Sequence, residues 1–174
     1  MTSFPKSRVA ERWGVNASPV IALARIGQVA LLTRLPEESV LPRAVADELQ
    51  AAPPEDPARQ AVESGLFRVV ETPAPSPVLI AWDLGRGETA VLAYALANPG
   101  WVAMLDDGAA RRCARSLSLA LTGTLAVVIL AKQHGLIESA AQVLLALRQA
   151  EFRLEDALVR KVLARTVNEV WPPA

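Results

Sequence analysis

Acidic or amide side chains occupy four places in the sequence where a strand is expected to lead into a helix. These positions are Asn16, Glu48, Glu88 and the adjacent pair Asp106 and Asp107. Because an open parallel sheet gathers its strand ends and helix N-termini at one edge, the four positions can converge in space. Carboxylate and amide oxygens suit a hard divalent cation such as Mg²⁺, which keeps several waters for substrate phosphates. The pattern therefore indicates metal-dependent phosphodiester chemistry.

Three of the four acidic residues also have a purely structural interpretation. Glu88 suits the first turn of a helix, where a negative charge complements the helix dipole. Glu48 follows Asp47 on a helix and suits a solvated surface. Asp107 can cap a helix, whereas Asp106 ends an apolar strand and has no such use. The acidic pair is therefore the strongest single indication of a metal site.

Basic residues follow the acidic pair directly. Arg111 and Arg115 lie one helical turn apart on the helix expected after Asp107, so they share a face. Residues 1–106 carry 9 Lys and Arg against 12 Asp and Glu, while residues 107–174 carry 9 against 6. This asymmetry is compatible with a basic rim beside an acidic pocket, although a solvated helix face is the alternative.

Length and composition limit the class of protein. A chain of 174 residues with 52% hydrophobic content suits one domain with a closed core. The longest nearly apolar run, residues 119–131, is far shorter than the ~20 residues needed to cross a bilayer. The N-terminus lacks the apolar region of a secretory signal, so we expect a cytoplasmic protein. The formal net charge of zero argues against binding nucleic acid by bulk electrostatics.

Strand and helix signals alternate along the chain. We expect a first strand that ends at residue 16 and further strands at 39–41, 67–70, 101–105 and 119–121. A proline-rich loop is expected at 72–77. Serine followed by proline predicts a helix from Ser18 to Ile26, and an apolar segment follows at 29–35. Further helices are expected at 42–51, 57–64, 85–97, 108–116, 124–135, 139–149 and 155–167. This βα alternation predicts an α/β fold with a parallel sheet.

Four strings in this order resemble one known family. They are NASPVIALARIG, LPRAVADEL, DLGRGETAVLAYA and AMLDDGAARRCARSLSLALTGTLAVVILAKQHGLI. Together they resemble the PIN-domain superfamily, and most closely an uncharacterised prokaryotic branch related to toxin–antitoxin ribonucleases. The resemblance covers about residues 15–165. It implies a three-layer α/β/α PIN-like fold with a central parallel sheet, and one domain over residues 1–174.

The resemblance also implies a site and a reaction. PIN domains bind Mg²⁺ or Mn²⁺ through carboxylates and cut single-stranded RNA. The implied metal ligands are Asn16, Glu48, Glu88, Asp106 and Asp107, of which Glu48, Glu88 and Asp107 are the implied catalytic residues. The implied contacts to substrate come from Ser18, Arg111, Arg115 and Thr124. Asn16 departs from the pattern, because an amide stands where the family has an acid and brings no charge to a cation.

These features predict a metal-dependent endoribonuclease, the toxin component of a toxin–antitoxin pair. Its expected partners are single-stranded RNA and a small antitoxin protein, without a membrane, and a homodimer is left open. The alternative is a catalytically weak or inactive PIN-like module that binds nucleic acid or protein. A signalling receiver domain fits poorly, because receivers place the acidic pair after the first strand, and this chain has Asn16 there.

Overall fold

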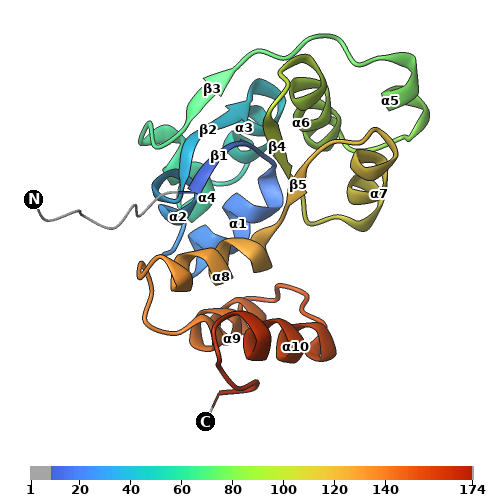
Figure 1. Ribbon diagram of the computed structural model, residues 1–174. Helices are drawn as coiled ribbons and strands as arrows, with labels where there is room; N and C mark the ends of the chain where they lie inside the picture. The colour runs from blue at the N-terminus through green and yellow to red at the C-terminus, as the bar shows by residue number, and fades with distance from the viewer. Residues whose placement is uncertain (1–8, 174) are drawn as a thin grey trace, which may run out of the picture.

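A five-stranded parallel sheet lies at the centre of the computed structural model, which describes residues 9–173. The strands are β1 (Val9–Val15), β2 (Pro36–Pro42), β3 (Arg68–Val70), β4 (Trp101–Met104) and β5 (Leu121–Thr122). Their order across the sheet is β3-β2-β1-β4-β5, and every neighbouring pair is parallel. Helices flank the sheet (Figure 1), so the chain has the expected three-layer α/β/α fold with a central parallel sheet.

Ten helices complete the described part of the chain. They are α1 (Ala17–Arg25), α2 (Leu31–Arg34), α3 (Arg43–Gln50), α4 (Pro57–Glu63), α5 (Pro77–Ala81), α6 (Arg86–Ala97), α7 (Gly108–Ser116), α8 (Thr124–Gln133), α9 (Ala140–Gln149) and α10 (Asp156–Thr166). Helix α1 packs against α4, α8 and α9, whereas α6 packs against α3, α5 and α7. Between residues 9 and 173, no helix combines the length and the apolar character needed to cross a bilayer.

The sheet order creates a switch point between β1 and β4. The chain moves from β1 to β2 and β3 on one side, then crosses over to β4 and β5 on the other. In open parallel sheets, the strand ends at such a reversal form a crevice that commonly binds ligands. Asn16 directly follows β1, and Asp106 lies two residues beyond β4. The topology therefore brings these two distant positions to the same place.

One hydrophobic cluster joins the sheet to the C-terminal helices. It includes the fully buried Trp13 of β1, Leu144 of α9 and Leu163 of α10, and it extends to Trp171. The final residues are held by polar contacts as well. Glu169 accepts hydrogen bonds from the Ala140 and Ala141 backbone N–H groups at the start of α9. The segment that follows α10 is thus held to the same core as the sheet.

The start of α1 differs from its expected position. The N-cap is Asn16 and the first helical residue is Ala17, so the prediction of Ser18 as N-cap with Pro19 at the first position was wrong. The backbone of Asn16 is extended, with φ −86° and ψ 170°, which lets β1 turn directly into the helix. The Ser18 hydroxyl is free for another contact because it does not cap the helix.

Two other elements differ from the sequence expectation. Helix α5 begins at Pro77, the last residue of the stretch 72–77 that was expected to be a loop. Ser76 caps this helix by accepting a hydrogen bond from the Leu79 N–H. Serine followed by proline was a readable start signal here. The last strand lies at 121–122 rather than 119–121, because the Leu119 N–H is bonded to the Ala114 carbonyl at the end of α7. Most other boundaries lie within two residues of those expected, and the apolar segment 29–35 contains α2.

Two of the four acidic or amide positions, Glu48 and Glu88, do not lie where a strand passes into a helix, contrary to expectation. Glu48 is the sixth residue of α3, in its second turn. Glu88 is in the first turn of α6, but α5 and a short loop separate that helix from β3. Contact between α3 and α6, rather than a strand end, places these two carboxylates.

Candidate functional site

Asn16 and Glu48 direct side-chain oxygens toward one point beside Gly87. A Cβ atom built on Gly87 would lie 3.0 Å from Asn16 Oδ1 and 2.9 Å from Glu48 Oε2. Asn16 is 5% exposed and, although it is the N-cap of α1, its side chain makes no capping hydrogen bond there. An N-cap asparagine ordinarily bonds the N–H groups of its own helix. This amide instead faces the glutamate of α3.

Glu88 connects this pair with the acidic residues that follow β4. Burial raises the pKa of Glu88, a hydrogen bond from the Gly85 N–H opposes the rise, and the negative charges of Asp107 and Glu48 raise the pKa further. Like charges disfavour the ionised form of a carboxyl group when they lie nearby. Glu88 therefore lies within electrostatic reach of both Glu48 and Asp107, and a cation there would relieve the repulsion.

Asp107 caps α7, as its position in the sequence predicted. Its Oδ2 accepts a hydrogen bond of 2.9 Å from the Ala110 N–H. Its side chain is also exposed, so the carboxylate is open to solvent beside the start of the helix. A capping role and a second role for the other oxygen are therefore compatible.

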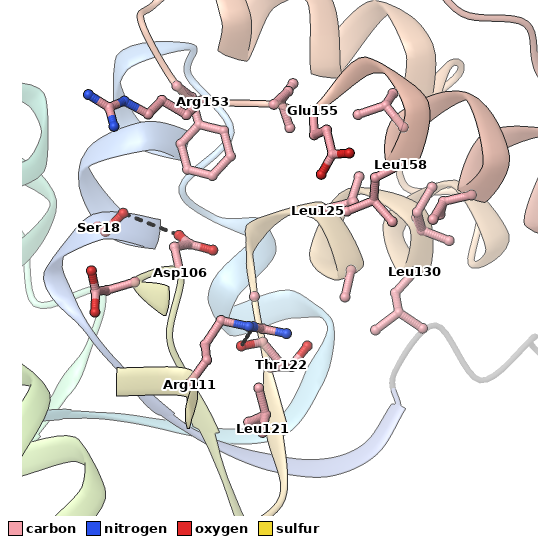
Figure 2. A pocket seen from close by; sticks show the side chains of 18 of the residues that line it. Ser18, Asp106, Arg111, Leu121, Thr122, Leu125, Leu130, Arg153, Glu155 and Leu158 are labelled. Carbon is pink, nitrogen blue, oxygen red and sulfur yellow. Dashed lines mark hydrogen bonds between the residues drawn. The ribbon is translucent and has the colours of Figure 1, made fainter. Parts of the chain in front are cut away.

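Asp106 holds three elements together, a structural role that the sequence did not lead us to expect. Its Oδ1 accepts from the Thr124 N–H at 2.8 Å, and its Oδ2 accepts from the Thr124 hydroxyl at 2.6 Å. Oδ2 also accepts from the Ser18 hydroxyl at 3.2 Å (Figure 2). Asp106 thus ties the segment after β4 to the first turns of α1 and α8.

Arg111 makes a similar connection through the backbone. One guanidinium nitrogen donates to the Leu105 carbonyl at 2.8 Å and to the Thr122 carbonyl at 3.1 Å, which joins the ends of β4 and β5. A Cβ on Gly123 would lie 2.9 Å from both this nitrogen and Asp106 Oδ1. Glycine is therefore required for this close approach.

The four residues expected to contact substrate have different surroundings. Thr124 is fully buried and bonded to Asp106, and Ser18 is bonded to the same carboxylate. Arg111 is half-buried against the strand ends, whereas Arg115 is exposed one turn further along α7. The Thr124 hydroxyl could donate a hydrogen bond to a substrate only by giving up its bond to Asp106. Among these side chains, Arg115 is the one freely available to an incoming anion.

A large groove begins at this cluster and runs toward the C-terminal helices. Its volume is about 1180 Å³. Ser18, Asp106 and Arg111 line it from α1 and the strand ends, while Arg153 and Leu158 line it from the C-terminal segment (Figure 2). The sequence analysis did not identify the far wall of this groove. No local pattern marks it, because only the tertiary fold makes residues 151–166 line the same groove as α8 and β5.

The carboxylates alone do not form a compact metal-binding group. Among residues 9–173, no three His, Cys, Asp or Glu side chains gather closely enough to hold an ion by themselves. The oxygen donors nonetheless suit a hard cation, because Mg²⁺ is usually bound through one or two carboxylates, with waters and substrate phosphates completing its coordination. The amide of Asn16 is a further oxygen donor beside them.

The sequence matches a family described as a PIN domain over residues 13–168. The chain belongs to the PIN-domain family. This membership accords with the sheet order and with the polar residues at the β1–β4 switch point. PIN domains have a nuclease-like fold and generally use divalent metal ions, and the family suggests nucleic-acid binding. Comparisons of the PIN-domain chain with curated proteins and with solved structures give no significant match.

Proposed function

We propose that this PIN domain is an endoribonuclease that cuts single-stranded RNA with Mg²⁺ or Mn²⁺. The observation that carries the proposal is the convergence of oxygen donors from α1, α3, α6 and α7. Asn16 and Glu48 face one point beside Gly87, and Glu88 feels the charges of Glu48 and Asp107. Four side chains from distant parts of the sequence thus bring oxygen atoms near the start of α6.

The donors divide into two roles in this proposal. Glu48, Glu88 and Asp107 supply the carboxylates that hold the cation and the reacting water, and Asn16 supplies a neutral oxygen. Asp106 acts indirectly, because both its oxygens already accept hydrogen bonds from Thr124 and Ser18. When bound, a divalent ion supplies a water nucleophile at neutral pH and offsets charge that develops on the phosphate.

The groove gives the RNA strand a path beside these residues. Its polar end contains Asp107 and Arg111, and the exposed Arg115 lies on the same helix. A guanidinium group binds phosphate oxygens through charge-assisted hydrogen bonds. We propose that Arg115 contacts the RNA backbone while Arg111 holds the strand ends in place.

The metal-binding part of the proposal is tested by titration with Mn²⁺. Glu88→Gln and Asp107→Asn remove one charge each but keep an acceptor for the Gly85 and Ala110 N–H groups. Wild-type protein should bind Mn²⁺ and gain melting temperature by mass action, and both variants should lose that gain. Asp47→Asn is the matched control, since Asp47 is exposed next to Glu48 on the same helix. Equal responses in all four proteins would contradict a specific site.

Cleavage is tested with single-stranded RNA in Mn²⁺ and in chelator. We expect metal-dependent products from wild type and at least about a hundredfold less from Glu88→Gln, since each ligand acts in the transition state. The proposed role as a cytoplasmic toxin rests on sequence resemblance. A small antitoxin gene beside this one, whose product binds the purified chain and stops cleavage, would support it.

A binding module that has lost cleavage is the second candidate. It is favoured by the neutral amide at Asn16 and by the lack of a three-carboxylate group within residues 9–173. Such a module would bind single-stranded RNA equally well in chelator and in Mn²⁺, and would leave it intact.

A further inference from the structure

We propose that Gly87 is a positioning residue, whose lack of a side chain lets Asn16 and Glu48 bring their oxygens to the same point. This inference rests on the proposed metal-dependent function, because it concerns how two of the proposed ligands are held. Gly87 itself offers no ligand atom. It acts by leaving space for Asn16 Oδ1 and Glu48 Oε2.

The backbone of Gly87 does not explain why glycine stands there. Gly87 is the second residue of α6, is buried, and does not belong to the glycines with positive φ. Alanine is the better helix former, so glycine weakens α6 relative to alanine at this position. The gain that offsets this loss must come from the surroundings of the missing side chain.

Those surroundings are mainly the two oxygens. A Cβ at Gly87 would lie 2.9 Å from Glu48 Oε2, 3.0 Å from Asn16 Oδ1 and 3.2 Å from Val45 Cγ2. All three distances are shorter than an ordinary van der Waals contact. The Glu48 oxygen is the nearest and must move, whereas the Asn16 oxygen and the Val45 methyl group must each shift by a few tenths of an ångström. No backbone atom is among these three neighbours. A methyl group there would therefore displace the side chains of the site and leave the path of the chain intact.

The two displaced side chains differ in freedom. Glu48 is exposed and can swing its carboxylate into solvent at little cost. Asn16 is 5% exposed and has little room to move. Gly87→Ala should therefore fold normally but separate the Glu48 carboxylate from the Asn16 amide.

Gly108 provides a matched control. It is the first residue of α7, directly after Asp107, so it is also a first-turn glycine close to the acidic residues. A Cβ there would lie 3.4 Å from the end of the Arg112 side chain, which is ordinary contact. Gly108→Ala thus makes the same chemical change without displacing a carboxylate or an amide.

The experiment measures Mn²⁺ affinity by calorimetry and melting temperature in chelator for the full chain. We expect Gly87→Ala to melt in chelator no lower than wild type, yet to bind Mn²⁺ at least about tenfold more weakly, as is typical when a group that orients a ligand is altered. Gly108→Ala should keep the wild-type affinity. In a Glu48→Ala background, Gly87→Ala should cost little further affinity, because the carboxylate it displaces is already absent.

These measurements distinguish a failure of the proposed role of Gly87 from a failure of the proposed metal binding. If wild type binds Mn²⁺ and Glu88→Gln does not, the metal site stands. Unchanged Mn²⁺ affinity in Gly87→Ala would then overturn the role of Gly87 alone, whatever its melting temperature. A loss of affinity that is equally large with and without the Glu48 side chain would also overturn it. Absence of Mn²⁺ binding by wild type would remove both proposals.

Discussion

At the residue scale, the proposed metal site has the neutral amide of Asn16 where a charged ligand would hold a cation more strongly. It occupies the place where the PIN-domain resemblance puts an acid, and its oxygen faces Glu48 across the space beside Gly87. An amide lessens the repulsion among the surrounding carboxylates and also lessens the attraction for a cation. The metal-free stability and the metal affinity therefore depend on this residue in opposite directions.

Asn16→Asp tests whether the metal-free stability and the metal affinity change in opposite directions. In chelator we expect the free energy of unfolding to fall by about 1 kcal/mol, because a second negative charge joins Glu48 at short range. The melting temperature should then fall by about 2–4 °C. In Mn²⁺ we expect tighter binding and stronger RNA cleavage, since ligand charge increases affinity for hard cations. Melting curves and calorimetry measure both effects, and unchanged Mn²⁺ affinity would show that residue 16 is not a ligand.

Thr124 tests the connection made by Asp106. Thr124→Val keeps the branched shape of a fully buried side chain but removes the hydroxyl that donates to Asp106 Oδ2. We expect it to lower the free energy of unfolding by about 2 kcal/mol, because a hydrogen bond to a charged group is lost. Thr124→Ser keeps the hydroxyl and should cost only about 1 kcal/mol for the missing methyl group. Chemical denaturation measures both, and a serine variant less stable than the valine variant would contradict this account.

At the element scale, the last residues of the chain complete the N-terminus of α9. Glu169 accepts from the Ser139 hydroxyl at 2.8 Å and from the Ala141 N–H at 2.7 Å, and Lys132 lies 3.7 Å away. Burial alone would raise the pKa of Glu169, but the hydrogen bonds from Ala141, Ser139 and Ala140 and the charge of Lys132 lower it below its ordinary value of 4.5. Ionised Glu169 therefore stabilises the folded chain.

Because folding lowers the pKa of Glu169, the stability of the protein should depend on pH in a defined direction. A carboxyl whose pKa is lowered by folding stabilises the protein above its unfolded pKa, and this contribution disappears as pH falls through the folded value. We expect Glu169→Gln to reduce the free energy of unfolding by about 2 kcal/mol at pH 7. The difference from wild type should shrink below pH 4.5. The exposed Glu138→Gln is the control in melting curves across pH, and a difference that grows toward acid would contradict the assignment.

At the scale of the whole molecule, the continuous core predicts a single unfolding unit. The cluster that contains Trp13 in the sheet also contains Leu163 of α10 and Trp171 near the chain end. Helices α9 and α10 therefore share their buried surface with the sheet. We propose that residues 1–174 form one domain that unfolds in one step.

Leu163→Ala distinguishes one domain from two. It creates a cavity at a fully buried position and should cost about 2–5 kcal/mol. In a single domain, the whole transition moves to lower temperature, and circular dichroism and tryptophan fluorescence still coincide. A new early transition, with the main one unmoved, would show that α9 and α10 unfold separately.

The sequence by itself determined where most strands and helices lie along the chain. Apolar runs, prolines and glycines act over a few residues, so local physics suffices to place β4, α7 and α9 close to their observed bounds. Asp107 as the cap of α7 is another local feature, and it was predicted correctly. Ser76 and Pro77 form an equally local start signal for α5, a helix that was not predicted from the sequence.

Tertiary structure alone decided which side chains meet. Ser18 and Asp106 are 88 residues apart, and only the switch point between β1 and β4 brings the hydroxyl to the carboxylate. Contact between α3 and α6 turns Glu48 toward Gly87, a relation that no spacing in the sequence encodes. The physical reason is that helix packing and strand order follow from the burial of the whole core, whereas a sequence pattern reports only the neighbours of each residue along the chain.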